Sequence, residues 1–160
     1  MARKEEIECK FLVHTDRMPP LPPGIRMAQA YLGFRPTVRV RTQEGPGDLR
    51  EAFLTIKGQG LVGRDEFEYP IPFDEAEALL LLATHPPVRK TRHHLPVEGQ
   101  PDLKWEVDIF NGENDGLVVA ELELPDRDHP FPRPEWLGED VTRDPAYKNA
   151  ALAQRPFRSW

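Results

Sequence analysis

The chain has 160 residues, of which 39% are hydrophobic, and a formal net charge of −6. This length predicts a single domain spanning 1–160, because it supplies one sizeable core and too little chain for two ordinary domains. An acidic chain is a poor partner for a nucleic acid polymer, whose binding needs a net basic surface or a basic stripe. Since no apolar run approaches the roughly 20 residues of a membrane span, we expect no membrane partner and a cytoplasmic location.

The first stretch of the chain alternates charged and apolar residues. With a period of two, residues 6–13 place Glu6, Glu8 and Lys10 on one face of a strand and apolar side chains on the other. One isolated strand of this kind is typical of a solvated surface. The same arrangement recurs along the chain, and this repetition favours a functional face.

Six further segments show the same alternation, at residues 37–41, 52–58, 64–69, 88–92, 103–110 and 117–124. Together the segments place basic and acidic side chains on one face: Lys10, Arg39, Arg41, Lys57, Arg64, Lys90, Arg92, Lys104, Glu6, Glu8, Glu66, Glu68, Glu106, Asp108, Glu121 and Glu123. A face made almost wholly of formal charge, opposite a strongly apolar one, predicts a mainly β barrel or tunnel with a charged lumen.

Two helices are predicted beside the strands. The first begins at Asp74, expected as its N-cap with Glu77 in capping-box spacing, and ends before a Pro-Pro pair. Its apolar residues repeat at helical spacing, so it should lie on an apolar sheet surface. A short closing helix is predicted over residues 144–153, where Asp144 and Pro145 form an N-terminal signature.

A charged lumen is costly unless its groups pair with one another or a ligand completes them. Arginine and lysine side chains suit phosphate oxygens, and clusters of carboxylates favour Mg²⁺ or Mn²⁺ over zinc. The lumen therefore predicts a site for a metal-bound oligophosphate. The five histidines show no metal-site spacing, and no nucleophile elbow, P-loop or dinucleotide fingerprint is present, so covalent catalysis is not expected.

The ordered set of charged motifs resembles the signature of the CYTH, or triphosphate tunnel metalloenzyme, superfamily. The matching motifs run through nearly the whole chain and comprise Glu6-x-Glu8-x-Lys10, Arg39-x-Arg41, Thr55-x-Lys57-Gly58, Arg64-x-Glu66-x-Glu68, Lys90-Thr91-Arg92, Val107-Asp108-Ile109-Phe110, Glu121-x-Glu123, and Val141-Thr142 followed by Tyr147-Lys148-Asn149. The resemblance implies a closed eight-stranded antiparallel β-barrel tunnel with a charged lumen and a few flanking helices. One departure is His93, where many members have a tyrosine.

The resemblance also implies roles for individual residues. Divalent metal, Mg²⁺ or Mn²⁺, would be held by four glutamates: Glu6, Glu8, Glu121 and Glu123. Phosphate oxygens would be bound by six basic residues: Lys10, Arg39, Arg41, Lys57, Arg64 and Arg92. Catalytic roles would fall to Lys90, Tyr31, Glu66 and Asp108. Lys90 is expected near the reacting end of the substrate with Tyr31 within its reach, while the two acids would orient the metal or the attacking water.

The expected function is divalent-metal-dependent hydrolysis of a triphosphate, first of all inorganic tripolyphosphate to pyrophosphate and phosphate, as in the similar bacterial members. Open alternatives are a nucleoside or thiamine triphosphatase, a class IV-type adenylate cyclase, and a non-catalytic polyphosphate or nucleotide-binding module. The partner is thus a small polyphosphate or nucleotide triphosphate, and a homodimer is left open. Some lumen residues would alternatively form plain ion pairs: Glu68, Lys104, Glu106, and Lys90 with Glu66 or Glu68.

Overall fold

The structure, a computed structural model, describes residues 7–58 and 65–160. Its strands are β1 Ile7–Val13, β2 Ile25–Phe34, β3 Thr37–Gly45, β4 Leu49–Lys57, β5 Glu66–Ile71, β6 Val88–Val97, β7 Gln100–Asn111, β8 Val118–Leu124 and β9 Leu137–Asp140. Its α-helices are α1 Phe73–Leu80 and α2 Asn149–Gln154, and short 3₁₀ turns occupy Thr15–Arg17, Gly112–Asn114, Pro145–Tyr147 and Phe157–Ser159. Within these described ranges, none of the helices has the length and apolarity that a membrane crossing requires.

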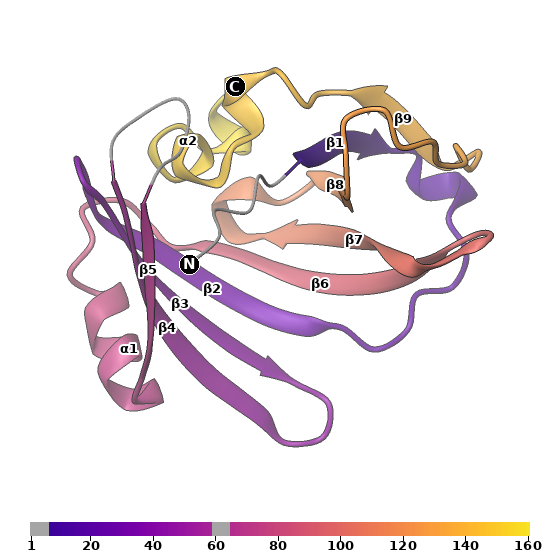
Figure 1. The fold of residues 1–160 in the computed structure, drawn as a ribbon. Helices are drawn as coiled ribbons and strands as arrows, with labels where there is room; N and C mark the ends of the chain where they lie inside the picture. The colour runs from indigo at the N-terminus through magenta and orange to yellow at the C-terminus, as the bar shows by residue number, and fades with distance from the viewer. Residues whose placement is uncertain (1–6, 59–64) are drawn as a thin grey trace.

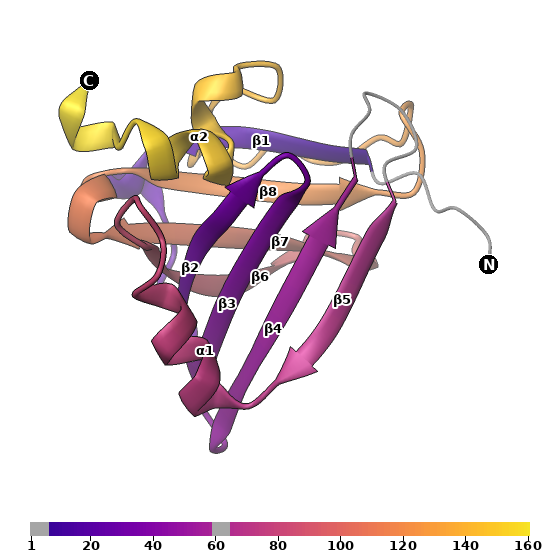
Figure 2. The ribbon, with the colours of Figure 1, turned by 90° about the vertical axis from the view of Figure 1, so that its left-hand side faces the viewer.

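The strands form one antiparallel sheet in the order β5-β4-β3-β2-β6-β7-β8-β1-β9. The sheet curves strongly, so that β2 to β5 form one wall and β6, β7, β8 and β1 form the other (Figures 1 and 2). Its edges are β5 and β9, which do not pair with each other among the described residues. The mainly β tunnel architecture is confirmed, but a closed barrel of eight strands is an overstatement: over residues 7–58 and 65–160 the sheet is open and has nine strands.

The ninth strand, β9, forms where the backbone around Gly138 lies close to the backbone of β1. It pairs with β1 on the side away from β8, with Leu137 opposite Val13 and Asp140 opposite Phe11. A Cβ atom added at Gly138 would lie 2.9 Å from the Leu12 carbonyl oxygen. Only glycine fits there without a shift of the backbone. A four-residue strand of this kind has no apolar alternation to reveal it in the sequence.

The outer face of the curved sheet is apolar and covered. Helix α1 packs Ala76 and Leu80 onto small and branched side chains of β2, β3 and β4: Ala28, Ala30, Val40 and Ala52. Figure 2 shows α1 lying against the outside of these strands. A second outer cluster is centred on the aromatic residues Phe11, Trp105 and Trp136. The expectation that the mid-chain helix lies on an apolar sheet surface is confirmed.

The predicted capping of α1 is wrong. The helix begins at Phe73, and its N-cap is Pro72, whose carbonyl accepts from the Ala76 N–H at 3.0 Å. Phe73 packs against the cluster that contains Ala76 and Leu80, and the helix includes it as its first residue, one position before Asp74. Asp74 therefore lies in the first turn, where its carboxylate is 3.7 Å from the Arg50 guanidinium.

The C-terminal helix is present but divided. The Asp144 side chain accepts from the Ala146 N–H at 3.0 Å, which confirms Asp144 as a cap. The turn it caps ends at Tyr147, because Lys148 adopts an extended backbone with φ −70° and ψ 142°. Helix α2 then starts at Asn149. The single predicted helix over 144–153 is therefore two elements with a break at Lys148.

Helix α2 fills one end of the inner, concave face. Leu152 and Ala153 pack against inner-face side chains that include Tyr31, Phe110 and Val119. These lie toward the end of β2, the end of β7 and the start of β8, which meet at one end of the curved sheet. In Figure 1, α2 sits above the strands at that end. The opposite end is left for the pocket described below.

Candidate active site on the inner face

The inner face of β1 and β8 carries the N-terminal charges. Glu8 lies opposite Glu123 in the ladder, and Lys10 lies opposite Glu121. The Lys10 ammonium is 3.3 Å from Oε1 of Glu121 and donates to the Tyr147 carbonyl oxygen at 2.9 Å. Strand pairing therefore confirms the alternation read from the sequence, and the C-terminal segment helps to fix Lys10.

Four inner-face carboxylates on β1, β8 and β7 form what we call the acidic wall: Glu8, Glu106, Glu121 and Glu123. Besides the Glu8–Glu123 pair, Glu106 lies directly opposite Glu121. Like charges in opposite ladder positions repel, and a bound cation relieves that repulsion. The oxygen-only donor set thus fits Mg²⁺ or Mn²⁺ chemically, although residues 7–58 and 65–160 contain no ready-made group of three His, Cys, Asp or Glu for a metal ion.

A buried ion cluster lies at the centre of β6 and β7. Asp108, which is fully buried, receives the Lys90 ammonium at 2.9 Å and two Arg92 nitrogens at 2.8 and 2.9 Å. Arg92 also reaches Glu106 at 2.8 Å through its remaining terminal nitrogen. The alternative partners considered for Lys90, Glu66 and Glu68, are therefore wrong. Register explains this, because Arg92 and Asp108 are directly paired across β6 and β7.

The ion cluster fixes the charge states of its members. Burial alone would raise the pKa of Asp108, but Lys90 and Arg92 together lower it to about 2. Burial lowers the pKa of Lys90, and the attraction of Asp108 offsets this only in part. Burial would likewise lower the pKa of Arg92, yet its hydrogen bonds to Asp108 raise it. At neutral pH Asp108 is therefore a carboxylate with a cation on each oxygen.

Arg39 and Arg41 form a second cationic group, on β3. Both guanidinium groups approach Glu68 of β5, at 3.8 and 3.9 Å respectively. Thr55, which is fully buried on β4, donates to the same Glu68 carboxylate at 3.0 Å and lies 3.3 Å from Arg39. These ion pairs are long and shared, so the arginine nitrogens retain donors for an anion. Glu68 occupies the ion-pairing role that the sequence suggested for it.

The two cationic groups lie on the inner face of β3 and β6, the strands on either side of β2. Burial lowers the pKa of Arg41, and the repulsion of Arg39 on the same strand adds to this. Arg92 on β6 contributes to the same lowering, while Glu106 on β7 opposes it. A single strand, β2, lies between β3 and β6, so the arginines of these two strands are near neighbours on the inner face. We call the set Arg39, Arg41, Lys90 and Arg92 the basic patch.

The remaining predicted site residues lie around this patch. Tyr31 is buried on β2, opposite Arg39, and burial raises the pKa of its phenol. It belongs to the same apolar cluster as Phe110, whose ring lies 5.5 Å from the Lys90 ammonium. Lys57 of β4 lies opposite Glu66 of β5 in the strand ladder, at the edge of the sheet. Glu6 and Arg64 lie outside the described residues.

The histidine that departs from the superfamily pattern lies away from the site. Alternation turns His93 to the face opposite Arg92, and its Nδ1 lies 2.7 Å from the Pro22 carbonyl oxygen. His94 lies on the inner face instead, 3.7 Å from Glu106. Burial lowers the pKa of His94, and the charge of Lys104 acts in the same direction. His93 therefore contacts the segment between β1 and β2 that contains Pro22, and it is not part of the charged inner face.

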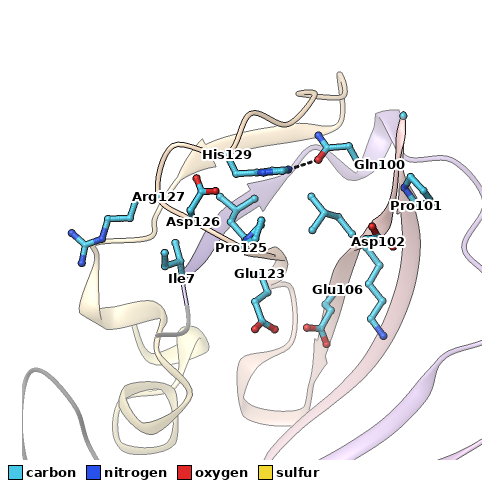
Figure 3. Close-up of a pocket in the computed structure, with 14 residues that line it drawn as sticks. Ile7, Gln100, Pro101, Asp102, Glu106, Glu123, Pro125, Asp126, Arg127 and His129 are labelled. Atoms are coloured by element: carbon cyan, nitrogen blue, oxygen red, sulfur yellow. Dashed lines mark hydrogen bonds between the residues drawn. The ribbon is translucent and has the colours of Figure 1, made fainter. Parts of the chain in front are cut away.

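The open end of the inner face holds a cavity of about 1090 Å³. Figure 3 shows the carboxylates of Glu106 and Glu123 side by side at the lower end of its lining, below a loop carrying His129. A hydrogen bond between His129 and Gln100 joins that loop to the β6–β7 hairpin. The cavity thus exposes two members of the acidic wall, Glu106 and Glu123, to solvent.

Two polar residues that contact the site were not assigned roles from the sequence. Thr55 bridges the Arg39–Glu68 group, and Asn149 at the start of α2 lies 3.5 Å from the Lys90 ammonium. Both stand in motifs noticed in the sequence, but motif position alone says nothing about contacts. Their roles follow from the β4–β5 register and from the packing of α2.

Comparison with known proteins finds relatives over nearly the whole chain. The chain matches the CYTH domain over residues 4–157. It is 41% identical to an inorganic triphosphatase of Acetivibrio thermocellus, over 98% of this chain and 97% of that protein. An inorganic triphosphatase of Nitrosomonas europaea is 38% identical, over 92% of this chain and 96% of that protein.

Solved structures show the same architecture. The crystal structure of the inorganic triphosphatase NE1496 matches with a TM-score of 0.70 and 31% identity, over 93% of this chain and 94% of that one. The PH1819 protein from Pyrococcus horikoshii shares the fold, with a TM-score of 0.54 and 21% identity over 78% of this chain and 80% of that one. Sequence and structure together place the chain in the CYTH domain family.

Proposed function

We propose that the protein hydrolyses a triphosphate with the help of a divalent cation, and that inorganic tripolyphosphate is its preferred substrate. The observation that carries this is the presence of a basic patch and an acidic wall on the same concave face, joined by the ion pair between Arg92 and Glu106. The names of the two curated relatives support the same reaction.

Substrate binding is assigned to five cations of the inner face, Lys10, Arg39, Arg41, Lys57 and Arg92, and, from the sequence pattern, to Arg64. At ~4 Å and an effective dielectric constant near 20, each well-placed cation attracts a phosphate charge by about 4 kcal/mol before desolvation is deducted. Several such contacts hold a triphosphate and stabilise the charge that spreads over its oxygens in the transition state. The chain's formal charge of −6 makes a small anion a better partner than a nucleic acid polymer.

Metal binding is assigned to the glutamates Glu6, Glu8, Glu121 and Glu123. Glu8 and Glu123 lie opposite each other in the ladder, and carboxylates are hard oxygen donors, which suit Mg²⁺ or Mn²⁺. When bound, the ion supplies charge neutralisation at the phosphoryl oxygens. Glu106 and Asp108 each lie 2.8 Å from Arg92, closer than the 3.3 Å between Glu121 and Lys10, so we leave these two out of the ligand set.

Lys90 is assigned to the reacting phosphoryl group. An ammonium has three donors. Among the described residues, Asp108 and Asn149 account for two of them, which leaves the third for a phosphoryl oxygen. Water attacks the terminal phosphorus in line, the bond to the bridging oxygen breaks, and pyrophosphate leaves. Asp108 positions Lys90 and Arg92, and the buried Tyr31 limits where the ammonium can sit.

Glu66 is assigned to the attacking water. It is exposed on β5, opposite Lys57, and carries a carboxylate oxygen to the edge of the inner face. A carboxylate there accepts a hydrogen bond from the water and turns its lone pair toward phosphorus. Because Glu66 acts on the water and not on the phosphates, its loss should lower kcat more than it raises KM.

The open-end cavity favours an inorganic substrate. None of the 14 residues lining it is Phe, Tyr or Trp. A nucleobase or a thiamine ring is commonly held by stacking on such side chains. This argues against nucleoside triphosphates, thiamine triphosphate and ATP cyclisation as the main reaction.

A phosphate-release panel tests the proposal. The purified protein is assayed with Mg²⁺ or Mn²⁺ on tripolyphosphate, pyrophosphate, ATP and thiamine triphosphate, with cyclic AMP measured alongside. We expect tripolyphosphate to give the highest kcat/KM. Arg41→Ala should lower it, while Arg50→Ala, on the outer face of the neighbouring strand, should not. Binding of tripolyphosphate without turnover would identify a non-catalytic module instead.

A further inference from the structure

Three buried side-chain nitrogens of the inner face have no hydrogen-bond partner within residues 7–58 and 65–160. They are Nε2 of Gln29 and the Nε atoms of Arg39 and Arg41. Gln29 is only 1% exposed. A buried donor left unpaired is costly, so folded proteins satisfy almost all of them with protein, water or ligand. Three such donors in one place indicate that something else accepts from them.

Strand register brings the three nitrogens together. Gln29 of β2 lies directly opposite Arg41 of β3, and Tyr31, two residues on, lies opposite Arg39. On its other side β2 pairs with β6, where Met27 lies opposite Lys90. Gln29 therefore stands on the inner face between the arginines of one wall and the lysine of the other, at the bottom of the basic patch.

A second glutamine on the same face shows that an unpaired amide is no general feature of these strands. Gln43 lies two residues beyond Arg41 on β3, and its Nε2 donates to Glu51 at 2.9 Å. Glu51 sits directly opposite Gln43 and serves as the acceptor. The ladder neighbours of Gln29 are instead Arg41, which has no acceptor in its side chain, and Val88.

We propose that Gln29 is a further substrate-binding residue, whose amide N–H donates to a phosphoryl oxygen of the triphosphate held by Arg39 and Arg41. This rests on the proposed function, since it supplies the acceptor for all three nitrogens. A phosphoryl oxygen only accepts, which matches three converging donors. A neutral amide adds a donor at the bottom of a cationic patch without another repelling charge, and it is cheaper to bury than an ammonium.

The substitution Gln29→Met tests this, because methionine keeps the unbranched shape and removes both N–H donors. Gln43→Met is the matched control, since it removes an amide on the same face that already has its acceptor. Gln29→Glu is the second variant, which keeps size and replaces the donors with a negative charge. Binding is read from the rise of Tm with tripolyphosphate in EDTA, and kcat and KM are read with Mg²⁺.

We expect Gln29→Met to weaken tripolyphosphate binding and raise KM by about 10- to 100-fold, the range for a hydrogen bond to a charged group. Gln29→Glu should weaken binding further, and Gln43→Met should stay within about twofold of the native protein. The Tm of Gln29→Met without ligand should not fall, because the removed donor had no partner to lose. Native-like binding and KM in Gln29→Met, or an equal loss in Gln43→Met, would overturn the assignment.

Different results would disprove the proposed hydrolysis and the proposed role of Gln29. If the native protein binds tripolyphosphate without releasing phosphate, the proposed hydrolysis is wrong while the Tm titration still decides the role of Gln29. If the native protein neither binds nor hydrolyses tripolyphosphate, both are wrong. If hydrolysis is normal and Gln29→Met matches the native protein, only the assignment of Gln29 is wrong.

Discussion

Replacing Asp108 by asparagine would remove the charge that the buried cluster depends on. Asp108 is fully buried and accepts from Lys90 and from two nitrogens of Arg92. Lowering its pKa from 3.8 to about 2 corresponds to roughly 2 kcal/mol of stability. Removing one partner of a buried ion pair costs more, about 3–5 kcal/mol, because the other charges stay buried. We therefore expect Asp108→Asn to lose between about 2 and 5 kcal/mol.

This loss is measurable by thermal unfolding. For a chain of this length each kcal/mol shifts Tm by about 2–4 °C, so Asp108→Asn should unfold roughly 4–20 °C lower. The matched control is Asp102→Asn, the same substitution at an exposed position of β7, which should change Tm by less than about 2 °C. If Asp108→Asn unfolds within 2 °C of the native protein, the buried cluster is not a stabilising unit and the reasoning fails.

Further predictions follow from the same geometry. Lys90→Ala should lower kcat and kcat/KM together, because an interaction made mainly in the transition state is lost; a raised KM with unchanged kcat would remove Lys90 from the catalytic residues. Burial lowers the pKa of Lys90, and its charged ammonium form is present only below that pKa. Activity should therefore be lost with rising pH at a pH below 10.5, the usual pKa of lysine. A pH profile of kcat checks this. Glu8→Gln and Glu123→Gln should lose activity that added Mg²⁺ or Mn²⁺ partly restores, and normal turnover at low metal would show that the residue is not a ligand. As pH falls from 3.8 toward 2, the stability contributed by the Asp108 carboxylate should disappear, and acid titration of Asp108→Asn should lack that component.

Alternation along single strands was enough to predict the inner face. Glu8 with Lys10, and Glu121 with Glu123, each share a face because side chains two apart in a strand point the same way, and the structure pairs these strands in register. The same rule placed the apolar side chains outward, against α1 and the aromatic cluster. Local periodicity therefore carries information about faces that does not depend on the rest of the chain.

Partners across strands could not be predicted in the same way. The alternative ion-pair partners for Lys90 were Glu66 and Glu68, yet its ammonium binds Asp108, because β6 pairs with β7 while β4, β3 and β2 lie between β6 and β5. Strand order is a property of the whole sheet and has no signature in a short segment. The same applies to closure: a charged face predicts a curved sheet, but whether the edge strands β5 and β9 meet depends on curvature summed over nine strands.

The start of α1 was predicted incorrectly for a different reason. Asp74 and Glu77 have the spacing of a capping box, but packing of Phe73 on the outer face moved the start of α1 to a proline cap. Both acids instead lie 3.7 Å from Arg50. A cap is worth about 1 kcal/mol, and burial of an aromatic side chain is worth more, so tertiary packing decides the boundary.

The measurement that tests the central claim most directly is ³¹P NMR of tripolyphosphate incubated with the protein and Mg²⁺, with an EDTA-treated sample beside it. The charged inner face predicts pyrophosphate and orthophosphate appearing in equal amounts with metal, and no change with EDTA. Tripolyphosphate that stays intact with metal, or that is cleaved equally fast in EDTA, would contradict it.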